Sequence, residues 1–480
     1  MNRIVVILIV SLLFLGCKNE QKPVVNTNQK PNIIYILADD MGIGDLGAYG
    51  QEIIKTPNLD ALAAKGMKFT QHYSGSAVCA PSRSTLMTGK HTGHTPIRGN
   101  KEAGKGLEGQ VPLPAETITL AEMLKEQGYA TGMFGKWGLG FEEGDPNSQG
   151  FDEFYGYNCQ KLAHRYYPPY LNHNQKRDSL KGNDGTNTAI YSQDKIQDHT
   201  IKFIDDNKDK PFFAYVPLAL PHAEIISPKD SIFKMYDGKF KETPYTEDNK
   251  YTSDYGPNMV WYEYCSVEKP KATYAAMITR IDAYVGQILA KVKELGLEEN
   301  TVIMFASDNG PSPEGGASPD FFKSNSHFRG YKRDLYEGGL RAPFIAVWPN
   351  KIKAGSESNH ISAFWDIVPT ISEITSAKTP NNIDGISFLP TLMGKKEQKQ
   401  HDYLYWEFNI KTGRKAIRKD VWKGVWYNIN NKKKPGSFEL YNLSTDIAEE
   451  TNIANENPEI VKELKQLMKE ASIPSELFPI

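Results

Sequence analysis

Cysteine is scarce in this chain of 480 residues, which contains only Cys17, Cys79, Cys159 and Cys265. They form no Cys-x-x-Cys pair and show no cysteine/histidine spacing typical of zinc sites, so a zinc-finger type of domain is excluded. Net charge is also small, because 56 lysines and arginines stand against 58 acidic residues. The composition therefore gives no electrostatic reason to expect a nucleic acid as partner, and an anionic substrate has to be met by local charge.

The N-terminal hydrophobic run, Ile4–Leu15, is shorter than the about 20 residues that a membrane span needs. It ends at Gly16-Cys17, which predicts a lipoprotein signal peptide over residues 1–16 and a lipid on Cys17, followed by a polar tether over residues 17–30. We therefore expect an exported chain, lipid-anchored in the cell envelope and facing the periplasm or the cell surface. The alternative is a plain signal peptide with an incidental cysteine. If Cys17 is lipidated, three cysteines remain, so at least one is unpaired.

Short apolar runs alternate with helical patterns through the first 375 residues. Buried-strand patterns cover residues 32–38, 129–136, 211–220, 301–306 and 342–349. Helical patterns cover residues 56–66, 119–128 and 272–295, with Thr56 as a possible cap and Thr119–Glu122 as a capping box. This alternation predicts an α/β fold whose central, mainly parallel sheet is covered by helices on both faces.

From about residue 376 the pattern changes to shorter elements. Three strand-like runs at 402–408, 414–429 and 437–443 precede an amphipathic helical pattern at 457–472. We predict a larger domain over residues 31–375 and a C-terminal α+β subdomain over residues 376–480, made of a small antiparallel sheet and a closing helix.

Two polar pairs follow predicted strands: Asp39-Asp40 after 32–38 and Asp308-Asn309 after 301–306. Their oxygen atoms suit calcium or magnesium and not a thiol-preferring metal. Either pair alone is more often a turn or a solvated cap. Because ligands of parallel sheets bind beyond the carboxyl ends of the strands, the two pairs together predict a cation site there, with His222 at the end of a third strand nearby.

The stretch "CAPSRSTLMTG" runs from Cys79 to Gly89. Pro81 is typical of a first helical turn, so Cys79 is expected just before a helix N-terminus, where backbone amides favour an anion. Arg83 adds a fixed positive charge. The alternative is a buried structural cysteine, which is the usual fate of a free cysteine.

This stretch resembles, at every position, the signature of the type I sulfatases in the alkaline-phosphatase-like superfamily. In that family a formylglycine-generating enzyme oxidises the signature cysteine to formylglycine. Other segments are similar to the family's metal, lysine and histidine segments: "PNIIYILADDMGIGDLGAYG", "GKWGLG", "PHAE", "SDNGP" and "FRGYKRDLYEGGLRAPFIAVWP". The tail "SFELYNLSTDIAEETNIA" also looks like the family's end. The resemblance implies that residues 31–375 are the catalytic domain.

The resemblance also implies roles for single residues. Cys79 becomes formylglycine, whose hydrate has one hydroxyl that attacks sulfur and a second that later expels sulfate. Arg83 holds this hydrate, and His222 is the candidate general acid for the leaving oxygen. Lys136 and Lys332 contact sulfate oxygens. One Ca²⁺ is bound by four residues, namely Asp39, Asp40, Asp308 and Asn309.

One position departs from the family pattern, which often reads "GKWHLG" with a histidine where this chain has Gly138. In the family that histidine helps to expel sulfate. His164, in the segment "YGYNCQKLAHRYYPPYL", is a candidate to fill the gap or to contact the sugar. Its alternative is a hydrogen-bonded loop histidine without a catalytic role.

The function expected from these residues is hydrolysis of sulfate esters, on sulfated polysaccharides or oligosaccharides met outside the cytoplasm. One alternative is a phosphomonoester or phosphonate-monoester hydrolase of the same superfamily. Another is a non-catalytic glycan-binding lipoprotein, although the cysteine and the metal-ligand residues are all present.

Overall fold

A computed structural model describes residues 30–104, 109–184, 187–247, 250–252, 260–262 and 264–480. The predicted signal peptide and Cys17 lie outside the described residues. Within the described part of the chain, no helix combines the length and the apolar character that crossing a membrane requires.

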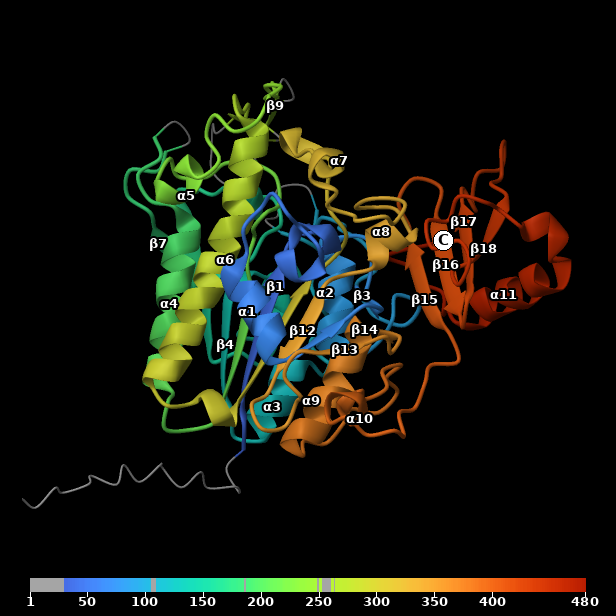
Figure 1. Ribbon diagram of the computed structural model, residues 1–480, viewed down its shortest axis with the longest axis horizontal. Coiled ribbons are helices and arrows are strands. Elements are labelled where there is room, and N and C mark those ends of the chain that lie inside the picture. The colour runs from blue at the N-terminus through green and yellow to red at the C-terminus, as the bar shows by residue number, and fades with distance from the viewer. Residues whose placement is uncertain (1–29, 105–108, 185–186, 248–249, 253–259, 263) are drawn as a thin grey trace, which may run out of the picture.

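Ten strands form one mixed sheet at the centre of the molecule (Figure 1). Their spatial order is β13 (Ser356–Ser358), β2 (Met67–Phe69), β12 (Phe344–Val347), β11 (Thr301–Ser307), β1 (Asn32–Ala38), β8 (Phe212–Pro217), β4 (Ala130–Lys136), β5 (Glu153–Tyr157), β6 (Tyr170–His173) and β7 (Lys176–Ser179). The central strands β11, β1, β8, β4 and β5 are parallel to their neighbours. The strands β12, β6 and β7 pair antiparallel, which makes the sheet mostly but not wholly parallel.

Helices cover both faces of this sheet, as the sequence predicts. One face is covered by α1 (Pro57–Lys65), α4 (Ser192–Asp206) and α6 (Pro270–Glu294), and the other by α2 (Cys79–Thr88), α3 (Leu120–Glu126) and α9 (Ile367–Thr375). The alternation along β1 explains this arrangement, because Ile34 and Ile36 pack toward the first set while Ile33 and Leu37 pack toward the second. The predicted α/β architecture is therefore confirmed.

A separate antiparallel sheet of four strands follows near the C-terminus. It consists of β15 (Leu404–Phe408), β16 (Arg414–Lys419), β17 (Trp422–Tyr427) and β18 (Phe438–Asn442), and it is followed by α11 (Pro458–Glu470). Leu464 and Met468 of α11 pack on one face of this sheet. The other face packs against Tyr73 and Trp365 of the larger part, so the small sheet shares a hydrophobic core with that part of the chain.

The short α10 (Leu389–Leu392) precedes the small sheet in the chain. Phe388 and Leu392 lie in the core of the large sheet, although residue 376 is the predicted start of the subdomain. The boundary stays a prediction.

Two local expectations differ from the structure. Helix α2 begins at Cys79 itself and not after it, because Pro81 is tolerated within the first turn, where its missing N–H has no helical acceptor. Thr56 does not cap α1; its hydroxyl instead accepts a hydrogen bond from the amide of Gly47 at 2.9 Å. The capping box at Thr119 and Glu122 is confirmed.

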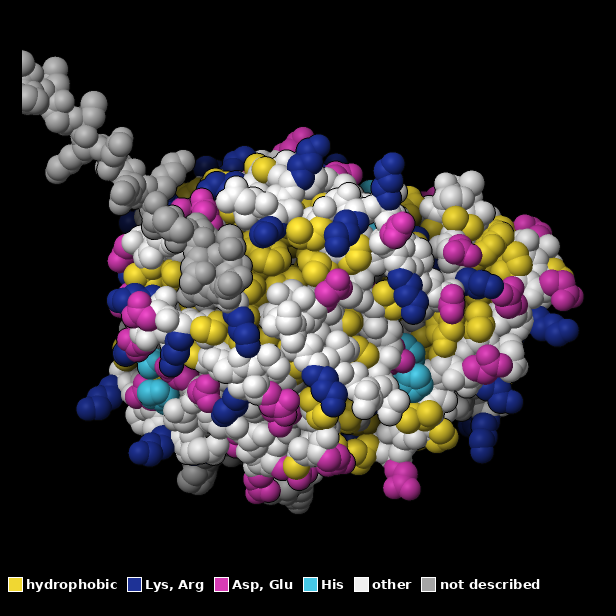
Figure 2. All heavy atoms as spheres, turned by 90° about the horizontal axis from the view of Figure 1, so that it is seen from below, with side chains coloured by type: hydrophobic (Ala, Val, Ile, Leu, Met, Phe, Trp, Pro, Cys, Tyr) yellow, Lys and Arg dark blue, Asp and Glu magenta, His cyan; other side chains and the backbone are white. Residues whose placement is uncertain are grey.

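Charged side chains of both signs are intermingled over the face shown in Figure 2. No broad area of one sign stands out on that face. Concentrated charge lies instead in the interior, at two places.

The first of these places joins the small sheet to the large part. Glu337 accepts hydrogen bonds from Lys423 Nζ of β17 at 2.7 Å, from Arg341 Nη2 at 2.6 Å and from the hydroxyl of Tyr73 at 2.7 Å. The Glu337 and Lys423 side chains are fully buried. An ion pair at this depth holds the two parts in one orientation, because separating it exposes bare charges to an apolar interior.

We predict that Glu337→Ala lowers the free energy of unfolding by about 3–5 kcal/mol, because it leaves the buried ammonium of Lys423 and the guanidinium of Arg341 without their carboxylate. Urea denaturation of the two proteins measures the difference. A matched control is Glu357→Ala, which removes an exposed partner of Lys68 and is expected to cost less than about 1 kcal/mol. Equal losses in both variants would contradict the role assigned to Glu337.

Candidate functional site

The second concentration of buried charge lies where the central strands end. Asp39 and Asp40 follow β1, and Asp308 and Asn309 stand at the end of β11, which is aligned with β1 to its last residue. The amide of Asp308 donates to the carbonyl of the last β1 residue at 3.0 Å. The two polar pairs that the sequence places at separate strand ends are therefore neighbours.

Direct hydrogen bonds hold these acidic residues together. Asn309 Nδ2 donates to Asp40 Oδ1 at 2.7 Å, and the amide of Asp40 donates to Asp308 Oδ1 at 3.2 Å. Asp40 adopts a left-handed backbone with φ of 66°, which turns its carboxylate back toward Asp308. All of these side chains, with Asp39, are at most 2% exposed.

Cys79 opens α2 and points into this cluster. Its Sγ lies 3.1 Å from Asp39 Oδ1 and 3.5 Å from Lys136 Nζ. Burial, and then the charge of Asp39, raise the pKa of the Cys79 thiol well above its ordinary value. The unmodified thiol is thus held protonated and is a poor nucleophile, so the position fits a residue that acts only after modification.

Cationic side chains surround the carboxylates. Arg83, one turn after Cys79, donates from Nη2 to Asp308 at 2.8 Å and lies 3.2 Å from Asp39. It also donates from Nη1 to the backbone carbonyl of Lys136. Lys136 is the last residue of β4, and its Nζ donates to Asp39 Oδ2 at 2.6 Å. Each charge is thereby paired, which is what burial at this depth requires.

Lys332 and His222 approach from the opposite side. Lys332 Nζ donates to Asp40 Oδ2 at 2.8 Å and to His222 Nε2 at 2.9 Å. His222 Nδ1 donates to the carbonyl of Ala223. Burial, and then Lys332, lower the pKa of His222 to about 4, below the ordinary value of about 6.5 for histidine. The imidazole is therefore neutral near pH 7.

His164 completes the group. It lies in a 3₁₀ turn after β5, and its ring stacks on that of His222 with centroids 4.7 Å apart. Its Nδ1 is buried and has no hydrogen-bond partner among the described residues. All of the residues that the sequence singles out for the site are therefore in one cluster, and their individual roles remain to be assigned by experiment.

Glu314 lies beside the cluster, although the sequence analysis did not predict it there. Glu314 Oε2 lies 3.6 Å from Lys332 Nζ, and Glu314 Oε1 lies 2.5 Å from Arg333 Nη1. Burial acts to raise the pKa of Glu314, but Lys332 and Arg333 outweigh it and bring the value down to about 2. Glu314 stands in the loop after β11, and no pattern in that loop distinguishes it from a surface glutamate.

The residues fit a hard divalent cation. The donors are carboxylate and amide oxygens, and Asn309 Oδ1 is buried without a hydrogen-bond partner in the described structure. Burial, and then the neighbouring Asp39, raise the pKa of Asp308 to about 7. The positive side chains alone therefore leave this carboxylate short of positive charge, and a cation held by Asp39, Asp40, Asp308 and Asn309 would supply it.

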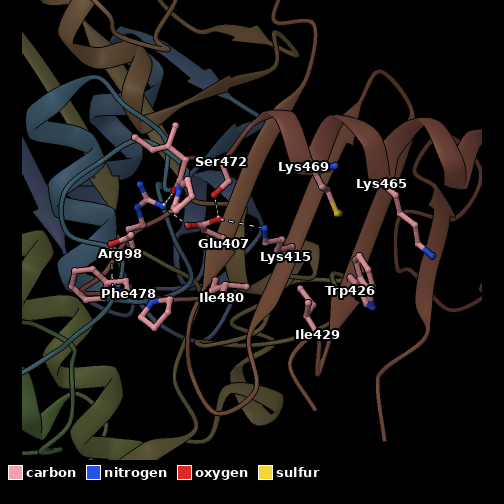
Figure 3. Close-up of a pocket in the computed structure, with 15 residues that line it drawn as sticks. Arg98, Glu407, Lys415, Trp426, Ile429, Lys465, Lys469, Ser472, Phe478 and Ile480 are labelled. Atoms are coloured by element: carbon pink, nitrogen blue, oxygen red, sulfur yellow. Dashed lines mark hydrogen bonds and ion pairs between the residues drawn. The ribbon is translucent and has the colours of Figure 1, made fainter. Parts of the chain in front are cut away.

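A cavity of about 540 Å³ lies elsewhere, in the C-terminal part (Figure 3). Its polar groups are already paired: Glu407 accepts from Arg98 at 2.8 Å and from Ser472 at 2.6 Å, and Lys415 lies 3.8 Å from the same carboxylate. None of the strand-end residues lines it. The strand-end cluster and this cavity are therefore two separate places in the molecule.

Comparisons with known proteins match most of this chain. The family model described as Sulfatase matches residues 31–377, and the model described as N-sulphoglucosamine sulphohydrolase, C-terminal, matches residues 327–473. An N-acetylgalactosamine-6-O-sulfatase of Bacteroides thetaiotaomicron is 30% identical and covers 95% of this chain and 96% of its own. Arylsulfatase A of Homo sapiens is 30% identical over 91% of this chain and 87% of its own. The solved structure of Ps i-CgsB in complex with k-i-k-neocarrahexaose has a TM-score of 0.74 and 26% identity, and covers 92% of this chain and 93% of that one.

We predict that Ca²⁺ or Mg²⁺ raises the melting temperature of the purified protein, with about 2.7 kcal/mol of stabilisation at a hundred times the Kd. Asn309→Ala removes one oxygen ligand, so it needs at least about tenfold more cation for the same shift. Calorimetric or fluorescence melting at several cation concentrations measures this effect.

The control for this experiment is Asp384→Asn, which changes a carboxylate in a separate cluster with His91 and His94. This variant is expected to show the same cation-induced rise in melting temperature as the wild type. A shift that disappears in Asp384→Asn and persists in Asn309→Ala would contradict the assigned site.

Proposed function

The chain belongs to the sulfatase family, and from the strand-end cluster we propose that it hydrolyses sulfate monoesters on sugar units of polysaccharides or oligosaccharides. It is a sulfuric ester hydrolase by family. The observation that carries the proposal is the position of Cys79. Its Sγ stands at the head of α2 between the carboxylate of Asp39 and the ammonium of Lys136.

Two groups belong to the proposal beyond the chain's own side chains: a formylglycine formed from Cys79 and one Ca²⁺ held by Asp39, Asp40, Asp308 and Asn309. When present, they supply a hydroxyl nucleophile and positive charge for a sulfate oxygen. The buried, protonated thiol supports the first, and the oxygen-only donor set with its unpartnered Asn309 Oδ1 supports the second.

The lysines bind the sulfate group in this proposal. Lys136 Nζ is paired with Asp39 at 2.6 Å, and Lys332 Nζ is paired with Asp40 at 2.8 Å. With a cation on the carboxylates, both ammonium groups become available to sulfate oxygens. Arg83 bridges Asp308 and the backbone of Lys136, so it orients residue 79 and the end of β4 at the same time.

The proton for the leaving oxygen comes from the Lys332–His222 pair. In this proposal His222 is the general acid: its Nε2, 2.9 Å from Lys332 Nζ, carries the proton that the departing alcohol oxygen takes, and the sulfate bound beside it favours that protonated form. His164, stacked on this ring, either takes over the task of the histidine absent at Gly138 or contacts the sugar.

The sugar class is inferred from the relatives. The bacterial relative with nearly full coverage is named for N-acetylgalactosamine 6-sulfate, and Ps i-CgsB was solved with a neocarrahexaose. We therefore place a sulfated hexose or N-acetylhexosamine first among substrates, with N-acetylgalactosamine 6-sulfate as the first compound to assay. A formylglycine-generating enzyme is the proposed maturation partner. Export and a lipid on Cys17 would bring the enzyme to polysaccharides outside the cytoplasm, in the periplasm or at the cell surface.

The test of this function uses protein from a host that contains the maturation enzyme. Mass spectrometry of the peptide with residue 79 is expected to show a loss of about 18 Da, the change from thiol to aldehyde. That protein should hydrolyse 4-nitrophenyl sulfate and at least one of N-acetylgalactosamine 6-sulfate, galactose 6-sulfate and N-acetylglucosamine 6-sulfate. Cys79→Ala should abolish turnover. Formylglycine-containing protein that hydrolyses no sulfate ester would refute the proposal.

A second prediction concerns the leaving group. His222→Ala should lower kcat for phenyl sulfate, whose leaving oxygen is strongly basic, by about 10²-fold or more, and kcat for 4-nitrophenyl sulfate much less. Initial rates with both esters measure the two effects. His360→Ala, which changes a buried histidine outside the cluster, serves as the control. It should change neither kcat for either ester nor the ratio of the two kcat values. Equal losses on both esters in His222→Ala would argue against proton donation through His222.

A further inference from the structure

The segment after β5 carries an unusual group of unpaired buried atoms. Asn158 Oδ1, Gln160 Nε2 and His164 Nδ1 are buried and lack a hydrogen-bond partner among the described residues. Asn158 is 3% exposed and Gln160 is 5% exposed. Each unpaired buried polar atom costs stability, so three within seven residues indicate that the segment is built to be completed by a ligand.

The segment lies against the sulfate-binding residues. β5 is parallel to β4, and the last residue of β4, Lys136, pairs with the last residue of β5. Just beyond, the amide of Gly138 donates to the carbonyl of Asn158 at 3.1 Å. At its other end, the segment reaches the ring of His222 through the stacked His164. The unpaired atoms therefore run from the Lys136 side of the cluster to the His222 side.

The absence of a side chain at Gly138 leaves space for the amide of Gln160. A Cβ at this position would lie 2.2 Å from Gln160 Nε2, and the backbone φ of 75° also favours glycine. The amide of Gln160 thus occupies the volume in which a side chain of residue 138 would begin. Lys136, two residues earlier in the chain, has its Nζ 3.5 Å from Cys79 Sγ.

The chemistry of the unpaired atoms selects the ligand. A sulfate group offers acceptor oxygens only, and it would be repelled by the acceptor Asn158 Oδ1. A sugar hydroxyl both donates and accepts, so it pairs with the carbonyl oxygen of Asn158 and with the N–H of Gln160 alike. A mixed set of donors and acceptors beside cationic sulfate ligands therefore matches the neutral ring that carries the sulfate.

We propose that Asn158 and Gln160, together with His164, form a subsite that binds the hydroxyl groups of the sugar ring next to the sulfate ester. This inference rests on the proposed sulfatase function and assigns the residues that distinguish a sugar sulfate from an aryl sulfate. A site whose buried polar groups pair with substrate hydroxyls rejects an analogue without them strongly, because those groups then stay unpaired.

The experiment compares kcat/KM for two esters on formylglycine-containing protein. One is 4-nitrophenyl sulfate, and the other is whichever sugar sulfate of the three above the wild type hydrolyses fastest. Gln160→Ala and Asn158→Ala should each lower the ratio of sugar to aryl turnover by about tenfold. Gln197→Ala is the matched control, since Gln197 is also buried with an unpartnered Oε1 but lies on α4, where its Nε2 donates to Tyr284. Its ratio should stay that of the wild type.

Variants of similar size test the subsite in case the alanine variants do not fold. Gln160→Glu keeps the side-chain shape while replacing the Nε2 donor with an oxygen, and Asn158→Leu keeps the side-chain size while removing the Oδ1 acceptor. Both should lower the same ratio in protein that melts as the wild type does. A ratio unchanged in the alanine variants, or in the variants of similar size if the alanine variants do not fold, would overturn the subsite while leaving the sulfatase function intact. A wild type that hydrolyses only the aryl ester would contradict the carbohydrate substrate itself, and the subsite with it.

Discussion

Balanced charge in a volume without water is the constraint around which this protein is organised. Three carboxylates and three cationic groups meet at the strand ends, namely Asp39, Asp40, Asp308, Arg83, Lys136 and Lys332, each at most 6% exposed. Moving any one of them from water to such a place costs several kcal/mol unless an opposite charge is in contact. Strands β1, β4 and β11 therefore have to end, and α2 to begin, at one place, with Lys332 brought in by a loop; a parallel sheet brings its carboxyl ends together in that way.

The same constraint explains why the small C-terminal sheet is not a separate appendage. Lys332 lies in the segment 328–341, several residues of which bond to the small sheet. Arg329 Nη1 donates to Tyr441 Oη at 3.0 Å, the amide of Leu335 donates to Tyr427 Oη at 2.9 Å, and Glu337 pairs with Lys423. The small sheet thereby fixes the backbone on both sides of Lys332, so one cation of the site is positioned by residues about a hundred positions later in the chain.

Much of this arrangement could be predicted from the sequence, because strands buried on both faces are continuous apolar runs and their ends are marked by polar pairs. That reasoning located Asp39, Asp40, Asp308 and Asn309, and the position of Cys79 before a helix; the resemblance to sulfatases added the lysines and the role of Cys79. The direction of β12 could not be predicted, since an apolar run reads the same in a parallel or an antiparallel pairing. The lowered pKa of His222 could not be predicted either, because it depends on burial and on Lys332, 110 residues away. Glu314, Asn158 and Gln160 have no local signature, since only the surroundings show which of their atoms are paired.

The contact between Gly138 and Gln160 also has a consequence for how such sequences can diverge. Two positions 22 residues apart share one small volume, so a side chain at the first requires the long amide at the second to move away. A shorter residue at position 160 would instead leave part of that volume empty. The residues at positions 138 and 160 should therefore covary among homologues, with an imidazole at the first position seldom accompanied by a glutamine in this orientation at the second.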